Sequence, residues 1–130
     1  MFRFNEHATS VIKNNINDSL KKCGIRAKTV LENNNRAISA VNKFDASELE
    51  HLYIWVRLMP YKNTDKYIVD ISNIILPDSK RGCGTFDIIY NRLKNCKYVE
   101  AVTITSPCTN SMYSWLNKNK LKEVSLGVWA

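Results

Sequence analysis

Apolar residues recur at helical spacing near the beginning of the chain, and polar residues occupy the positions between them. This pattern is typical of an amphipathic helix, which we expect from Asn5 to Lys22, ending at Gly24. The apolar residues of its buried face are Val11, Ile12, Ile16 and Leu20. The next segment, Ala27–Glu32, is ambiguous, and we interpret it as a short second helix.

The middle of the chain is rich in β-branched and aromatic residues, which favour strands. Strands are predicted at Arg36–Val41, Leu49–Met59 and Tyr67–Leu76. The polar segment Pro60–Asp65 has the composition of a turn. We therefore expect the last two of these strands to form an antiparallel hairpin.

The second half of the chain alternates between strand and helix patterns. One helix is predicted to close near Asn95, because Phe86, Ile89, Tyr90 and Leu93 fall on one helical face. A strand follows at Tyr98–Thr105, and a further helix begins at Thr109 or Asn110. The strand-helix-strand order predicts one parallel strand pair. Short strands are expected at Leu121–Val124 and Leu126–Trp129.

Length and composition indicate a single folded domain over residues 1–130. The chain has 130 residues, of which 45% are hydrophobic, enough for one core. The predicted elements place it in the α+β class, with a mixed and mostly antiparallel sheet. No apolar run reaches the length that crosses a bilayer, and the first residues lack the pattern of a secretory signal. We therefore expect a cytoplasmic protein without membrane contact.

The net charge and the cysteine spacing exclude few classes of ligand or site. The net charge of +7 suits an anionic coenzyme, an acidic partner or a nucleic acid. The four cysteines, at positions 23, 83, 96 and 108, form no C-x-x-C pair. We expect free thiols and no metal site. Cys83 is the one cysteine placed where a helix start can lower a thiol pKa, but a spacer residue in the turn is its favoured role.

The most informative segment runs from Ile74 to Phe86. An apolar strand leaves through Pro77 into a basic, glycine-containing turn, Lys80–Gly84, and a helix is predicted to begin at Thr85. Glycines allow successive backbone N–H groups to point at one place, and a helix N-terminus attracts anions. The segment therefore predicts a phosphate cradle. The alternative is an ordinary basic loop with two glycines.

This segment resembles the signature R/Q-x-x-G-x-G/A of the GNAT superfamily of acyl-coenzyme A dependent N-acyltransferases. Arg81 and Gly84 match its first and fourth positions. The resemblance implies a sheet with helices on both faces and a parallel strand pair at the cofactor cleft. It also implies that acetyl-CoA is the co-substrate, with its pantetheine beside the strand and its pyrophosphate on the turn. The implied coenzyme-binding residues are Ile74, Ile75, Leu76, Arg81, Gly82, Cys83, Gly84, Thr85 and Phe86.

The chain departs from the family pattern at three places. Phe86 replaces the small sixth residue of the signature, and its ring either narrows the phosphate site or enters the core, which we favour. Leu116 stands where the family often has a tyrosine that protonates the leaving thiolate. Tyr113, one helical turn earlier, is the candidate substitute, although packing is the commoner role for such an aromatic. Asn110 matches a pantetheine-binding asparagine only after a shift of one residue.

Asp70 is the candidate base. It lies eleven residues before Arg81, which is similar to the spacing of the acidic residue in the histone-acetylating branch of the family. Strand alternation would place Asp70, Ser72, Ile74 and Leu76 on one face. If that face lines the cleft, burial raises the pKa of Asp70 toward that of a useful base. The alternative, equally favoured, is that Asp70 lies at the solvated beginning of the strand.

The resemblance implies an N-acetyltransferase that moves an acetyl group from acetyl-CoA to an amine by direct attack in a ternary complex. The alternative is a catalytically weak or inactive module of the same fold that binds a host macromolecule, and small proteins of this kind occur in phages. We do not expect nucleic-acid binding, because neither a stacking platform nor a helix-turn-helix is evident. The acceptor, a protein or a small molecule, is not identified by the sequence. Monomer and homodimer both remain open.

Overall fold

The computed structural model describes residues 5–32, 36–42, 52–76, 84–107 and 110–130. These residues form an α+β structure with a mixed seven-stranded sheet and three helices. The helices are α1 (Glu6–Lys22), α2 (Thr85–Lys94) and α3 (Asn110–Lys118). The strands are β1 (Ala27–Glu32), β2 (Ala37–Asn42), β3 (Tyr53–Pro60), β4 (Tyr67–Ile75), β5 (Val99–Thr105), β6 (Glu123–Ser125) and β7 (Val128–Trp129).

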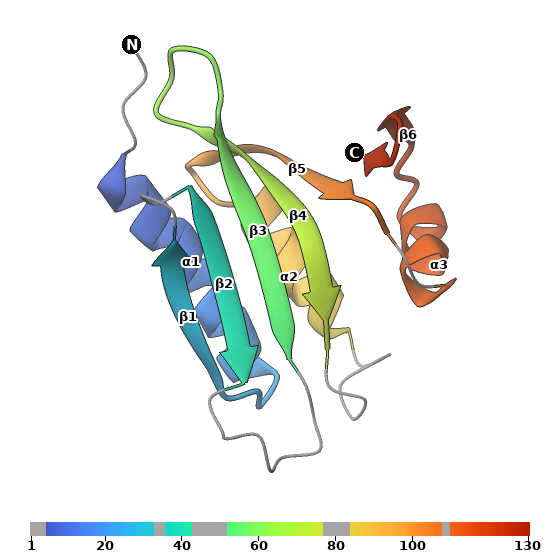
Figure 1. The fold of residues 1–130 in the computed structure, drawn as a ribbon, viewed down its shortest axis with the longest axis horizontal. Coiled ribbons are helices and arrows are strands. Elements are labelled where there is room, and N and C mark those ends of the chain that lie inside the picture. Colours follow the sequence, from blue (N-terminus) through green and yellow to red (C-terminus); the bar gives the residue numbers. More distant parts are fainter. Residues whose placement is uncertain (1–4, 33–35, 43–51, 77–83, 108–109) are drawn as a thin grey trace.

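The sheet order is β1-β2-β3-β4-β5-β7-β6 (Figure 1). The first four strands form an antiparallel meander, and β4 and β5 are parallel, joined through α2. This parallel pair was expected from the strand-helix-strand pattern. The C-terminal strand β7 pairs antiparallel with β5 and carries β6 at the edge.

Helix α1 begins and ends as its sequence predicts. The Asn5 side chain accepts a hydrogen bond of 3.0 Å from the backbone N–H of Ala8, which satisfies one donor of the first turn. At the other end Gly24 adopts a positive φ of 72°, and the N–H of Ile25 reaches back to the carbonyl of Leu20. The buried face includes Ile12, Ile16 and Leu20.

The segment Ala27–Glu32 is a strand, not the second helix that we expected. All six of its residues pair with β2, so tertiary pairing decides a segment whose local propensities are mixed. Thr29 and Val30 are β-branched and fit a pleated strand. The Thr29 hydroxyl also donates a hydrogen bond of 3.1 Å to Asn17, which ties the strand to α1.

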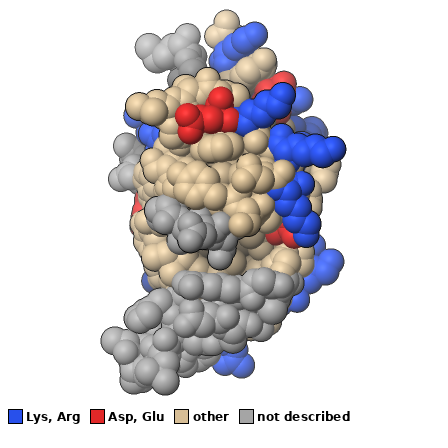
Figure 2. Space-filling model, turned by 90° about the vertical axis from the view of Figure 1, so that its right-hand side faces the viewer, with Lys and Arg blue, Asp and Glu red and all other residues tan. Residues whose placement is uncertain are grey.

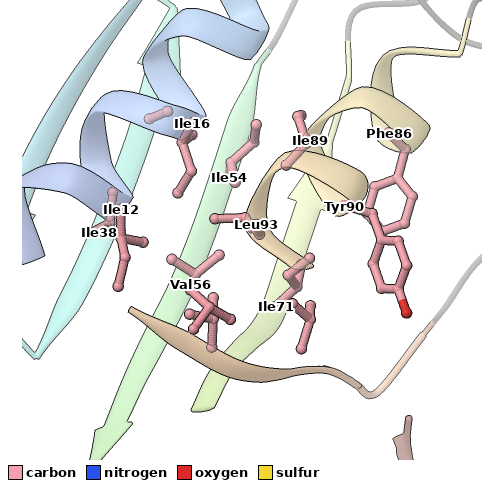
Figure 3. Close-up of a cluster of buried hydrophobic side chains, with 14 of the residues drawn as sticks. Ile12, Ile16, Ile38, Ile54, Val56, Ile71, Phe86, Ile89, Tyr90 and Leu93 are labelled. Atoms are coloured by element: carbon pink, nitrogen blue, oxygen red, sulfur yellow. The ribbon is translucent and has the colours of Figure 1, made fainter. Parts of the chain in front are cut away.

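One hydrophobic core lies between the sheet and the helices α1 and α2. These two helices cover the same face of the sheet (Figure 1). Figure 3 shows Ile12 and Ile16 of α1 and Ile89 and Leu93 of α2 directed at the strands. Apolar side chains of β2, β3 and β4 complete this cluster, including Ile38, Ile54, Val56 and Ile71.

A bulge interrupts the regular pairing of β3 with β4. Trp55 pairs with Asn73 and Val56 pairs with Ile71, so Ser72 is an extra residue on β4. Directly paired residues share a face, so beyond the bulge Ile74 lies on the core face with Val56 and Ile71. The simple alternation that placed Asp70 and Ile74 on the same face is therefore wrong.

Within the part of the chain that the structure describes, no helix is long and apolar enough to cross a membrane.

Candidate functional site

A cleft opens where the two parallel strands separate. Their pairing ends at Ile71 and Ile104, whereas β4 continues to Ile75 against β3 alone. On its other side β5 is held by β7, through Ile104 and Thr105. The cleft is lined by Ile71, Ser72, Asn73, Ile74, Ile104, Thr105, Ser106, Pro107 and Met112. It therefore combines residues of β4, residues of β5 and the two that follow it, and Met112 of α3.

The far end of β5 is fixed by a tight turn beside this cleft. Ser106 adopts a positive φ of 53°, and its N–H donates a hydrogen bond of 2.7 Å to the carbonyl of Gly127. This bond ties the end of β5 to the C-terminal hairpin. The wall formed by β5 is thus anchored on the side opposite β4.

Asp70 lies behind the cleft wall and connects three strands. Its Oδ1 accepts hydrogen bonds from the hydroxyls of Thr103, at 2.6 Å, and Thr105. Its Oδ2 accepts one of 2.7 Å from Ser72 and one of 3.1 Å from Nη2 of Arg57. Only 1% of Asp70 is exposed, so the alternative of a solvated strand beginning is excluded.

The hydrogen bonds to Asp70 oppose the effect of its burial. Burial raises the pKa of Asp70, but the bonds from Thr103, Thr105, Ser72 and Arg57 lower this pKa by more, so it lies below the ordinary value. The carboxylate is consequently ionised at neutral pH. The expectation that burial makes Asp70 a stronger base is corrected, because its charge is satisfied by four donor side chains.

The helix that follows the glycine-containing turn begins as predicted. Gly84 precedes α2 with a φ of 80°, and no side chain caps the helix at this residue. Thr85, the first helical residue, is buried. The other residues assigned to the phosphate cradle, Arg81, Gly82 and Cys83, lie outside the described residues. The described part of the cradle is therefore the start of α2.

Phe86 enters the core, which is the interpretation that the sequence favoured. Its ring meets that of Trp115 edge to face, with 4.5 Å between ring centroids, and Tyr90 completes the cluster. The indole N–H of Trp115 donates a hydrogen bond of 2.6 Å to Asp87. Phe86 thus packs α2 against α3. Its ring does not project toward the beginning of α2, where it would narrow the phosphate site.

The residues assigned to α3 take different positions. Leu116 is fully buried, whereas Tyr113 is 43% exposed. The rings of Tyr113 and Trp129 form a T-shaped contact. Among the described side chains of this helix, Met112 lines the cleft and Tyr113 does not. Asn110 is the first residue of α3. The structure therefore brings Asp70 next to the cleft wall but does not bring Tyr113 into the cleft lining.

The residues assigned to the pantetheine arm lie at the end of β4. Ile74 lines the cleft and packs against the core, Leu76 also packs against the core, and Ile75 is 43% exposed. Ile75 pairs with Tyr53 of β3. This end of β4 is the part that has separated from β5.

Sequence reasoning missed the four donors that surround Asp70. A signal was present, because Thr103 and Thr105 alternate along a predicted strand and Arg57 interrupts an otherwise apolar run from Leu52 to Met59. Their common partner could not be inferred, since it depends on the register of three strands.

Among the described residues, no group of His, Cys, Asp and Glu side chains is arranged to hold a metal ion. Comparison of the chain with protein families, with curated proteins and with solved structures found no match. The candidate site therefore rests on its own geometry: a cleft between diverging parallel strands, with the start of a helix following the strand that lines it.

Proposed function

We propose that the protein is an N-acyltransferase that transfers an acetyl group from acetyl-CoA to an amine. The observation that carries this proposal is the separation of β4 and β5 beyond Ile71 and Ile104. A cleft between two parallel strands gives an extended ligand access to strand edges. The resemblance of the sequence to the GNAT signature assigns that place to the thioester and pantetheine of the coenzyme.

The two parts of the coenzyme would meet different elements. The end of β4, beyond its last pairing with β5, offers a strand edge to the amide-containing pantetheine arm. The start of α2 offers the N-terminal end of a ten-residue helix to the pyrophosphate. Gly84 contributes no side chain there, so phosphate oxygens can approach the backbone closely.

In the proposed reaction the amine nitrogen attacks the carbonyl carbon of the thioester. A C–N bond forms, the C–S bond breaks, the amine loses a proton to solvent, and the departing sulfur takes up a proton. Because Asp70 is ionised and held by four donors, we assign it the positioning of Ser72 and Thr105, not the removal of that proton. The cleft contributes chiefly by holding the two reactants together.

The charge of the protein supports an anionic co-substrate. The net charge is +7, and Figure 2 shows Lys and Arg side chains gathered along one edge of the side that carries α3. A positive surface raises the rate at which an anion with several phosphates is encountered. This argument supports coenzyme binding and says nothing about the acceptor.

Isothermal titration calorimetry with acetyl-CoA tests the proposal. We expect saturable binding to the unmodified protein and its loss in Gly84→Glu and Arg81→Glu variants, because each places a carboxylate at the assigned phosphate site. Lys118→Glu, a charge change in α3, is the control and should bind. No binding by the unmodified protein would remove the proposal.

A second candidate is coenzyme binding without turnover, in an interaction module of the same fold. It is favoured by one observation, the absence of Tyr113 from the cleft lining. Release of free thiol from acetyl-CoA in the presence of amines distinguishes the two. Binding without amine-dependent thiol release would select the module.

A further inference from the structure

Two hydroxyl groups that line the cleft donate hydrogen bonds to the carboxylate of Asp70. Ser72 and Thr105 both line the cleft, and both donate a hydrogen bond to the carboxylate of Asp70. A hydroxyl has one proton to donate and two lone pairs that accept. Because an ionised carboxylate can only accept, these two hydroxyls have only lone pairs left to offer to a ligand.

The position of Asp70 makes this orientation fixed. The residue is 1% exposed; its Oδ1 is held by Thr103 and Thr105 of β5, and its Oδ2 by Ser72 of β4 and Arg57 of β3. Rotating either hydroxyl toward the cleft would leave a buried charge with one donor fewer, which is costly. The β-bulge at Ser72 gives that side chain its place beside Asp70 at the mouth of the separated strands.

We propose that Ser72 and Thr105 form a binding site for a primary ammonium group, with Asp70 behind them. An ammonium group carries three N–H donors and no acceptor, which matches hydroxyls that present only lone pairs. The Asp70 carboxylate adds a negative charge one hydrogen bond further away, although Arg57 offsets part of it. Identification of this group as the acceptor amine rests on the proposed function. The binding site itself does not.

Thr103 supplies a matched control for the site. It donates to the same oxygen of Asp70 as Thr105 does, from the same strand, but it does not line the cleft. Replacing either threonine by valine removes one donor from Asp70. Only Thr105→Val also removes an acceptor from the cleft.

Nuclear magnetic resonance titration of the whole protein tests the site without coenzyme. The probes are n-butylammonium, n-butyltrimethylammonium, which is a cation without N–H donors, and N-propylacetamide, a neutral N–H donor. We expect n-butylammonium to shift the amide signals of Ser72, Asn73, Thr105 and Ser106. The trimethylated cation should bind at least about tenfold more weakly, because it can make no hydrogen bond. A response to the amide but not to n-butylammonium would overturn the assignment and favour pantetheine amides instead.

The variants decide whether the hydroxyls act directly. Thr105→Val should weaken n-butylammonium binding by about tenfold or more, whereas Thr103→Val should change it by less than about twofold. Equal losses in both variants would show that the threonines act only by supporting Asp70, and the site would be rejected. Ser72→Ala gives an independent second test if Thr105→Val does not fold.

Failure of this site and failure of the proposed function give different results. If acetyl-CoA binds but the probes do not respond as expected, the acyltransferase proposal stands and the ammonium site falls. If n-butylammonium binds at Ser72 and Thr105 but acetyl-CoA does not bind, the site stands and its ligand is an amine in another context.

Discussion

At the residue scale, Asp70 receives hydrogen bonds from side chains of β3, β4 and β5. Its two oxygens engage Thr103, Thr105, Ser72 and Arg57. Such an arrangement stabilises the ionised form and fixes the strands around it. The carboxylate therefore orders the cleft wall, and its charge is expected to matter for folding as well as for binding.

Asp70→Asn should lower the free energy of unfolding by about 2–3 kcal/mol at pH 7, because it removes the charge that several donors share. The folded-state pKa of Asp70 is lowered, so its stabilising contribution is present above the unfolded pKa of about 4 and is lost as pH falls through the folded-state value. Urea unfolding at several pH values measures this. The difference between variant and unmodified protein should shrink in acid, and Asp65→Asn, at an exposed position, is the control.

Phe86→Ala should cost about 3–4 kcal/mol of stability, because it opens a cavity between Tyr90 and Trp115. Tyr113→Ala, at an aromatic residue that is 43% exposed, should cost less than half as much. Thermal or urea unfolding of both variants makes the comparison. A small loss in Phe86→Ala would contradict its place in the core and return it to the phosphate site.

At the element scale, most helices and strands could be predicted from periodicity, and the failures have physical causes. The pattern of α2 is unambiguous because Phe86, Ile89, Tyr90 and Leu93 share one face. The conformation of Ala27–Glu32 is set by its pairing with the strand that follows it. The local sequence pattern carries no information about that pairing. The faces of β4 reverse at Ser72 because one extra residue enters the ladder. Likewise, the spacing of Asp70 from Arg81 identified it as a candidate site residue, but its hydrogen-bond donors could not be predicted.

The start of α2 depends on the conformation of Gly84. Its φ of 80° is unfavourable for a residue with a Cβ atom, although the space around it is open. Gly84→Ala should therefore cost about 1–2 kcal/mol through the backbone alone. Gly84→Asn should cost less, because asparagine tolerates this conformation better. Chemical unfolding of both variants measures the difference, and equal costs would contradict the backbone explanation.

At the scale of the whole molecule, the net charge of +7 predicts a salt dependence of coenzyme binding. Raising the salt concentration from about 0.05 M to about 0.5 M should weaken acetyl-CoA binding severalfold, because mobile ions screen long-range attraction. Pantetheine carries no phosphate, so its binding should change little. Calorimetry with both compounds tests this. Equal salt effects on the two compounds would show that the net charge does not contribute to recognition of the coenzyme's phosphates.

The strands of the sheet differ in how far apart along the chain their pairing partners lie. Each strand of the meander β1 to β4 pairs with its neighbour along the chain, whereas β5 reaches β4 only after α2, and β7 is held to β5 over two residue pairs. Short-range contacts form quickly, and elements with few pairings open most readily. The meander is therefore suited to fold while the rest of the chain is still being synthesised. In the finished protein, local opening of the C-terminal hairpin would remove the support of Ile104 and Thr105 in the cleft wall while β5 stays paired with β4.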